Sequence, residues 1–269
     1  MKVVFTSHRV ENLPFLKKEF EKSDVIVLEE PKNDLLEKVL NGEISVESYL
    51  RFVDTQFPLY TRKLIEMLRE FRGKKILQIE PYLEEVEKLR EENRGDERVR
   101  EIERKVNLAY LDYVEAFMRG DFDEIVEKVI DFAKADAERF VIRDKMRADA
   151  INFDCAIEAG VMHTKLAEFL DAETVSIPEL IAEKLGVEYL EPPGNILTKS
   201  FIYGFDCERE LLAARSLIYV TLTKKEELSP NDVEFPHFLY EQKLIRFVNK
   251  LDYEKCERLF FKLWRRKSI

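Results

Sequence analysis

Four short apolar segments limit the folds open to this chain more than any other feature. They are rich in β-branched or aromatic residues, polar or helix-breaking residues bound each one, and they cover residues 2–6, 24–29, 74–80 and 153–160. Runs of this kind are typical of strands buried on both faces of a parallel sheet. A short helix expected around 12–22 joins the first two segments and favours a right-handed βαβ unit.

Long blocks with helical spacing separate these predicted strands. Pro58 divides the block at 45–72 into two helices or kinks it. Apolar residues then recur every three or four positions, which predicts a large helical insertion at about 82–150 with a break and a new helix start at 120–124. A fifth strand is expected at 172–178.

The predicted fold class is therefore α/β, with a central, mostly parallel sheet, flanking helices and the large helical insertion. We expect one α/β domain at 1–224 that contains the insertion. A C-terminal helical extension at 225–269 is expected to pack on this domain. The stretch at 207–222 is expected to start as a helix and to end as either helix or strand.

The charge balance narrows the range of partners. Lys and Arg total 44 against 54 Asp and Glu, and no basic stripe extends along the sequence, which argues against nucleic acid as the main ligand. Charged residues make up 36% of the chain, a usage that resembles that of thermophilic proteins. Three widely spaced cysteines without a CxxC pair indicate reduced thiols, and no apolar run reaches the roughly 18–20 residues that span a membrane. We expect a cytoplasmic protein without a membrane partner, and a homo-oligomer stays open.

Polar side chains follow the predicted strands at their carboxyl ends. His8 comes just after the first strand, Glu29 ends the second, and Glu80 ends the third. Glu158 lies near the end of the fourth strand, with His163 one turn further on. Ligands of open parallel sheets collect at this edge, so we expect these side chains to contribute to one site.

Histidine and carboxylate side chains together are a natural ligand set for a divalent transition metal such as Mn, Co or Zn. The set His8, Glu29 and His163 would leave open positions on the metal, and a bound water would become a hydroxide nucleophile near neutral pH. Simpler roles stay open: His8 as a polar residue that opens a loop, and His163 as a helix-start residue bonded to the backbone. His237 starts a late helix and is expected to be structural.

Two motifs in the middle of the chain form an ordered pair. An Arg-Asp pair at 143–144 lies in a predicted helix, and Gly-Val-Met-His at 160–163 follows the next strand. The pair resembles the signature of the TraB/PrgY and Tiki family, which belongs to a wider group with erythromycin esterases and ChaN-like proteins. Phe-Thr-Ser-His at 5–8 and the strand that ends in Glu29 match the family's two N-terminal motifs in the same order. The resemblance covers residues 1–172 loosely.

The resemblance implies a divergent member of this family with its site at the strand ends. It implies a metal-dependent hydrolase that cleaves a peptide or ester bond in a small-molecule or peptide substrate, with peptide cleavage as a family activity. Arg143 would orient a carboxylate or bind an anionic group, or would form an ordinary helix ion pair. Asp144 would fix a histidine tautomer, and Glu158 could share that task. The catalytic groups would be Glu29, Arg143, Glu158 and His163, and the metal ligands would be His8, Glu29 and His163.

Phe5 departs from the family pattern, in which the first motif begins with glycine. Its ring would fill the space that a close backbone approach uses. The helical insertion and the tail after 224 have no counterpart in the family. An alternative function therefore stays open: a non-catalytic binding or regulatory protein on the same scaffold, with the acidic helical insertion as the surface for a partner.

Overall fold

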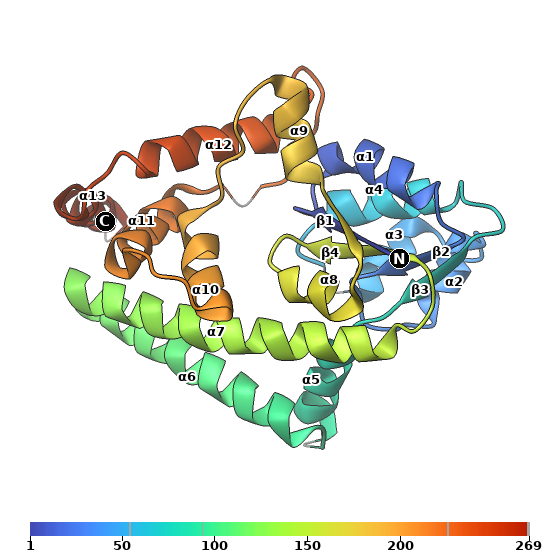
Figure 1. The fold of residues 1–269 in the computed structure, drawn as a ribbon, viewed down its shortest axis with the longest axis horizontal. Coiled ribbons are helices and arrows are strands. Elements are labelled where there is room, and N and C mark those ends of the chain that lie inside the picture. Colours follow the sequence, from blue (N-terminus) through green and yellow to red (C-terminus); the bar gives the residue numbers. More distant parts are fainter. Residues whose placement is uncertain (54, 93, 225, 268–269) are drawn as a thin grey trace. The chain divides into compact units, whose positions relative to one another are not determined.

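In the computed structural model, five parallel strands form one sheet in the order β3-β2-β4-β1-β5 (Figure 1). The structure describes residues 1–53, 55–92, 94–224 and 226–267. The predicted α/β fold class is confirmed, and all five predicted segments contribute a strand. The strands are β1 (Lys2–Thr6), β2 (Val25–Leu28), β3 (Lys75–Gln78), β4 (Ala156–Gly160) and β5 (Glu173–Ser176).

The strand order places three carboxyl ends side by side. β4 lies in the middle of the sheet, with β1 on one side and β2 on the other. Thr6 at the end of β1 is paired with Gly160 at the end of β4, and Val27 of β2 is paired with Ile157. Residues that follow β1, β2 and β4 therefore emerge at one edge of the sheet.

Two compact units make up the chain, and each consists of separate sequence segments. Unit 1 contains the sheet and consists of Met1–Glu84, Arg143–Glu188 and Glu226–Phe238. Unit 2 is helical and consists of Glu85–Ile142, Tyr189–Lys225 and Leu239–Ile269. The units are thus interleaved along the chain, whereas the predicted boundary falls once, between 224 and 225.

The helices of unit 1 are short and connect the strands. Pro58 occupies the first position of a new helix, so the block at 45–72 is two helices and not one kinked helix. A core cluster covers one face of the sheet and joins Val3, Val27 and Ile157 to Leu166. The unit contains the 3₁₀ helix η1 (Val10–Asn12), α1 (Leu13–Phe20), α2 (Leu35–Leu40), α3 (Val46–Phe52), α4 (Pro58–Leu68), α8 (Thr164–Leu170) and α9 (Ile177–Leu185).

Unit 2 holds most of the predicted helical insertion, which is confirmed. Gly120 adopts a left-handed conformation with φ 77° and ends one helix, and the Asp121 side chain accepts a hydrogen bond from the Glu124 amide at the start of the next. The core of the unit gathers Phe122, Ile218 and Phe260, among others. Its helices are α5 (Pro81–Glu92), α6 (Glu97–Arg119), α7 (Phe122–Ala150), α10 (Pro193–Tyr203), α11 (Arg209–Leu222), α12 (Pro236–Val248) and α13 (Tyr253–Lys267).

Three of these helices cross between the segments of the two units. α5 and α12 begin in segments of unit 1 and continue in unit 2, while α7 begins in unit 2 and carries its last two turns into unit 1. The stretch at 207–222, which the sequence left as helix or strand, is helical in α11. In the described part of the chain, no helix has both the length and the apolar content needed to cross a membrane.

Candidate functional site

A strained turn presents His8 at the end of β1. His8 has φ 52°, a left-handed conformation that is uncommon for residues other than glycine. Its amide donates to Thr6 Oγ1 at 3.2 Å, and the buried Asn12 donates to Thr6 Oγ1 at 3.0 Å and to Ser7 Oγ at 2.7 Å. These bonds offset a backbone strain of about 1–3 kcal/mol, so the conformation of His8 is imposed by its surroundings.

Glu29, directly after β2, is held by three donors. Its Oε1 accepts from Arg143 Nη2 at 2.8 Å and lies 2.9 Å from His163 Nε2, while its Oε2 accepts from the Gly160 amide at 2.5 Å. Burial favours the neutral acid, but the charges of His163 and Arg143 hold the pKa of Glu29 well below its usual range. Glu29 is therefore an ionised carboxylate fixed in one orientation.

Gly160 leaves room for two imidazole rings to approach the same carboxylate. A Cβ atom built on Gly160 would lie 3.4 Å from Glu29 Oε2, 3.5 Å from His163 Cδ2 and 3.6 Å from His8 Cε1. The two histidine rings and the carboxylate therefore all border this position. The absence of a side chain keeps the space between them open.

His163 bridges two carboxylates. It is 2% exposed, and its Nδ1 lies 2.5 Å from Asp144 Oδ1 while its Nε2 faces Glu29. Burial opposes its positive charge, but the Glu29 charge and the Asp144 hydrogen bond raise the pKa of His163 to about 9. Asp144 also accepts from the amide of Leu166 at 3.0 Å, which fixes it on the first turn of α8. His163 is thus a buried imidazolium at neutral pH.

Two arginines from the last turns of α7 tie the strand ends together. Arg143 Nη2 donates to Glu80 at 2.9 Å as well as to Glu29. Arg147 is fully buried and donates to the carbonyl oxygens of Ile79 at 3.0 Å and Glu158 at 2.6 Å. Arg147 is not among the site residues predicted from the sequence, although its place one turn after Arg143 puts both on the same helix face.

Glu158 and His8 form the more open side of the site. Glu158 Oε1 accepts a hydrogen bond from the hydroxyl of Tyr60, and His8 Nε2 lies 3.7 Å from Glu158 Oε1 and 3.9 Å from Glu29 Oε2. Both gaps are too long for direct hydrogen bonds and suit a bridging water. The side chain of His8 is 25% exposed, whereas those of Glu29, Glu158 and His163 are at most 9% exposed. His8 is therefore the most solvent-accessible of these four side chains.

Two aromatic side chains that were not predicted as site residues flank His8. The ring of Tyr60 meets the His8 ring edge-on at 5.5 Å between centroids, and Phe57 lies parallel to it at 6.4 Å. Burial, together with the charge of Glu158, raises the pKa of Tyr60 well above its usual value, so the phenol keeps its proton and acts as a donor. No spacing in the sequence connects Tyr60 to the strand ends.

A second, half-buried carboxyl group, that of Glu30, lies beside Glu158. Glu30 accepts a hydrogen bond from Gln78 Nε2 at 2.8 Å, and Tyr49 lies 3.5 Å away. Burial raises the pKa of Glu30, and the charge of Glu158 adds to the effect. The site therefore contains carboxyl groups in contrasting environments, because Glu29 is surrounded by cations and Glu30 by neutral groups and a like charge.

The segment 226–238 holds the helix that carries Tyr60. Glu227 accepts hydrogen bonds from the amides of Leu59 at 2.8 Å and Tyr60 at 2.9 Å, at the start of α4. His237 Nε2 accepts from the amide of Leu228 at 2.6 Å, and burial lowers the pKa of His237 to about 4. His237 is thus a neutral residue with a backbone partner, which agrees with the structural role expected for it.

Phe5 does not fill the space beside His8. It packs with the core cluster that contains Val3, Ile157 and Leu166. Side chains alternate between the two faces of a strand, so Phe5 and Glu158, which is paired with Val4, point to opposite faces. The departure from the family motif therefore leaves the surroundings of Glu158 unchanged.

The predicted metal set comes together, but its donors are already engaged. Both ring nitrogens of His163 lie at hydrogen-bond distance from carboxylates, and Glu29 is bound by cations and an amide. Within residues 1–53, 55–92, 94–224 and 226–267, no group of three or more His, Cys, Asp or Glu side chains is arranged to hold a metal ion. The side chains as they stand do not fit a metal, and the metal site stays a prediction.

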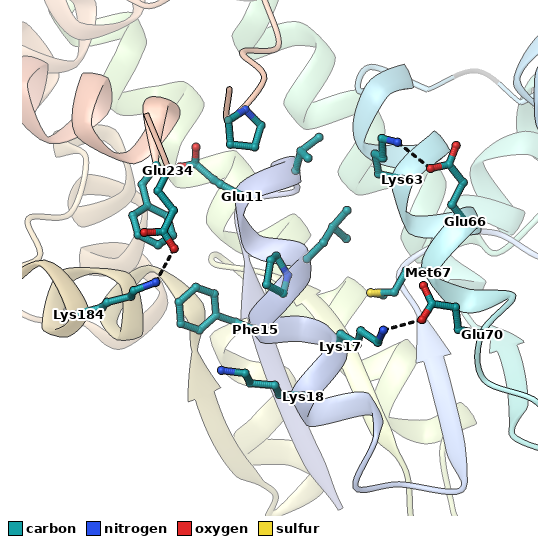
Figure 2. A pocket seen from close by; sticks show the side chains of 15 residues that line it. Glu11, Phe15, Lys17, Lys18, Lys63, Glu66, Met67, Glu70, Lys184 and Glu234 are labelled. Carbon is teal, nitrogen blue, oxygen red and sulfur yellow. Dashed lines mark hydrogen bonds and ion pairs between the residues drawn. The ribbon is translucent and has the colours of Figure 1, made fainter. Parts of the chain in front are cut away.

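A separate pocket of about 610 Å³ in unit 1 contains none of these residues. Figure 2 shows the pairs Lys17–Glu70, Lys63–Glu66 and Lys184–Glu234 around it, together with Phe15. Its charged side chains thus largely neutralise one another. It lacks histidine and has no strand end in its lining, so the strand-end site remains the better place for chemistry.

A comparison with known proteins finds one close relative. No protein-family model matches the chain, and no solved structure matches it. An uncharacterized protein of Archaeoglobus fulgidus is 59% identical over 267 residues, which cover 98% of this chain and 99% of that protein. Its source is a thermophilic archaeon, in keeping with the thermophile-like charge content. The chain belongs to the same protein family as this archaeal protein.

Proposed function

We propose that this protein is a hydrolase whose reaction takes place beside His8 at the carboxyl ends of β1, β2 and β4. The observation that carries the proposal is the convergence of His8, Glu29, Glu158 and His163 from distant segments on the space beside Gly160. The resemblance to the TraB/PrgY and Tiki family supports hydrolysis of a peptide or ester bond as the reaction class.

His8 acts as the general base in this proposal. A water in the gap between His8 Nε2, Glu158 Oε1 and Glu29 Oε2 attacks the acyl carbon and gives its proton to His8 Nε2. The bond between the acyl carbon and the leaving oxygen or nitrogen then breaks, and His8 returns the proton to the leaving group. Glu158 accepts a hydrogen bond from the second hydrogen of the water, and its charge lies on the same side as His8 Nε2, where it stabilises the imidazolium that forms.

The remaining charged groups, Glu29, Arg143, Arg147 and His163, form a supporting frame. His163 and Arg143 fix the orientation of Glu29, and Arg147 joins the ends of β3 and β4. Arg143 fits the role of orienting carboxylates, which was one of the two predicted for it, because its Nη2 binds both Glu29 and Glu80. The frame holds the water-binding carboxylate within the narrow range of positions that catalysis requires.

Hydrolysis of a panel of activated esters and fluorogenic peptides tests the proposal. We expect turnover by the wild type and a loss of about 100-fold or more in kcat/KM in His8→Ala, which is the usual contribution of a general base. The matched control Arg72→Gln changes an exposed residue before β3, at the opposite edge of the sheet, and keeps the wild-type rate. Wild-type activity that persists in His8→Ala would refute the role of His8.

Chelation separates this mechanism from the metal-dependent one that the family resemblance implies. No step above uses a metal, so we expect full activity after exhaustive chelation. Activity that is lost on chelation and restored by Mn, Co or Zn would return a metal to the mechanism. Stoichiometric metal in the purified wild type that disappears in His163→Ala would do the same.

A binding protein on the same scaffold is the second candidate. It is favoured by the solvent-exposed apolar side chains on α6, where Leu108 is 53% exposed, Leu111 54% and Met118 75%. Such side chains on one helix are typical of a surface that a partner covers. The two candidates differ in the hydrolysis assay, because only the first predicts turnover that depends on His8.

A further inference from the structure

Arg9 carries the one guanidinium beside His8 that no acid of the described chain neutralises. It directly follows His8, and its guanidinium carbon lies 4.5 Å over the ring of Phe57, which stacks against His8. Across the described residues, its guanidinium makes neither a hydrogen bond nor an ion pair, and its Nη1 is buried without an acceptor. The Arg9 charge also lowers the pKa of His237, so the guanidinium lies near His237 as well as over Phe57, and it has no acidic partner in the described part of the chain.

Across the described residues, Arg143 Nε and Arg147 Nη1 are also buried without a partner, but these two arginines bind through their other nitrogens. Arg143 binds two carboxylates and Arg147 binds two backbone carbonyls. Glu11, two residues after Arg9, accepts from the amides of His237 at 3.0 Å and Phe238 at 2.7 Å. The acid nearest to Arg9 in the sequence is therefore committed to the start of α12.

A buried donor without an acceptor is costly, at about 1–3 kcal/mol or more when it is charged. Arg9 persists in this state in a chain in which 54 acidic residues outnumber 44 basic ones. An acceptor from outside the chain would remove this cost. The aromatic contact with Phe57 stabilises the guanidinium through its face and leaves its N–H edge for that acceptor.

We propose that Arg9 binds a carboxylate group of the substrate, so that the site selects molecules with a carboxylate near the scissile bond. This inference rests on the proposed hydrolase function, because only a hydrolase would cleave the bound molecule. The binding of the carboxylate itself does not require turnover. A guanidinium recognises a planar carboxylate through two parallel hydrogen bonds. Adjacent chain positions and the shared contact with Phe57 keep Arg9 and His8 close enough to engage one small molecule.

A carboxylate suits this place better than a phosphate. Glu29, Glu30, Glu80 and Glu158 lie around the strand ends, so the site is rich in acidic groups. A phosphate group with nearly two negative charges is repelled by such surroundings more strongly than a carboxylate with one. The proposal therefore commits to a singly charged anionic group.

Binding of three probes without a hydrolysable bond tests the inference. The probes are 4-phenylbutanoate, the neutral 4-phenylbutanol and 4-phenylbutylphosphonate, and their affinities at neutral pH are measured by calorimetry or NMR titration. We expect the wild type to bind the carboxylate at least about 10-fold more tightly than the alcohol, and more tightly than the phosphonate. Equal binding of carboxylate and alcohol, or tighter binding of the phosphonate, would overturn the proposal.

Substitutions assign the preference to Arg9. Arg9→Gln is expected to abolish the difference between carboxylate and alcohol, and Arg9→Lys to keep only part of it, because the lysine retains the charge but not the planar fork. Arg72→Gln removes the same charge from the opposite edge of the sheet and keeps the full difference. A preference that survives in folded Arg9→Gln, or in Arg9→Lys at full strength if the glutamine variant does not fold, would contradict the assignment.

The hydrolysis panel remains an independent readout. If Arg9 determines carboxylate binding while none of the esters or peptides is cleaved, the hydrolase proposal fails and the Arg9 site stands. If esters are cleaved in a His8-dependent way without any preference for carboxylate probes, the Arg9 proposal fails and the hydrolase stands.

Discussion

The two histidines at the strand ends have opposite surroundings. His163 is buried, and a carboxylate faces each of its ring nitrogens. His8 is partly exposed, has a strained backbone, and stands 3.7 and 3.9 Å from its nearest carboxylates. Both ring nitrogens of His163 thus have carboxylate partners, whereas His8 Nε2 has no direct hydrogen bond to either of its neighbouring carboxylates. The comparison separates a supporting frame around His163 from a reacting side around His8.

The frame should dominate stability, and the largest effect is expected for Glu29→Gln. The substitution removes the carboxylate that lies against the His163 imidazolium and Arg143, and breaking a buried ion pair in this way costs about 3–5 kcal/mol of unfolding free energy. Chemical denaturation measures the loss. The control Glu66→Gln removes an exposed pair with Lys63 and should change stability by less than about 1 kcal/mol.

The pH dependence of stability is the next test of the frame. The pKa of His163 is raised to about 9 in the folded protein from 6.5 in the unfolded chain. Its contribution of about 3 kcal/mol is therefore fully present below pH 6.5 and is lost as the pH rises through about 9. Denaturation at pH 6 and pH 10 should show this loss in the wild type and a smaller one in His163→Gln. An equal loss in both would contradict the imidazolium.

Loss of the Tyr60 hydroxyl should affect the reacting side with little effect on the frame. Tyr60→Phe leaves Glu158 without its hydroxyl donor, and the lost hydrogen bond to a charged group is worth about 1.5–3 kcal/mol. We expect kcat to fall by about 10-fold or more. Glu227→Gln, which weakens the capping of α4, should reduce kcat less. A larger effect in Glu227→Gln than in Tyr60→Phe would show that the helix position matters more than the hydroxyl.

The smallest expected effect is a gain in stability, whereas the substitutions above reduce stability or activity. Glycine adopts the left-handed conformation without strain, so His8→Gly should gain about 1 kcal/mol of unfolding free energy relative to His8→Ala, which keeps the strain. Thermal denaturation of the two variants measures the difference. Equal stability would indicate that the His8 backbone is not strained.

The strand-end rule explains how much of the site could be predicted from sequence. Short β-rich segments identify parallel strands, and the carboxyl ends of neighbouring strands meet, so His8, Glu29 and Glu158 could be expected at one edge. Tyr60 could not, because its approach to Glu158 depends on how α4 packs on the sheet. Gln78, whose side chain donates to Glu30, was also missed, because a polar residue inside a predicted strand gives no sign of its partner.

The division into units shows a similar limit. The helical insertion between β3 and β4 was visible in its periodicity. Its association with the segments Tyr189–Lys225 and Leu239–Ile269 depends on apolar contacts such as those of Phe122 with Phe260, which lie far apart in the sequence. The sequence pattern therefore suggests one late boundary, whereas packing produces interleaved segments.

Chemical rescue tests the central claim most directly. In His8→Gly, the missing ring leaves a partly exposed gap that added imidazole can enter, whereas the gap in His163→Gly is buried between two carboxylates. The account predicts that imidazole restores saturable hydrolysis to His8→Gly and not to His163→Gly. Hydrolysis by His8→Gly at the wild-type rate without imidazole, or rescue of His163→Gly alone, would contradict it.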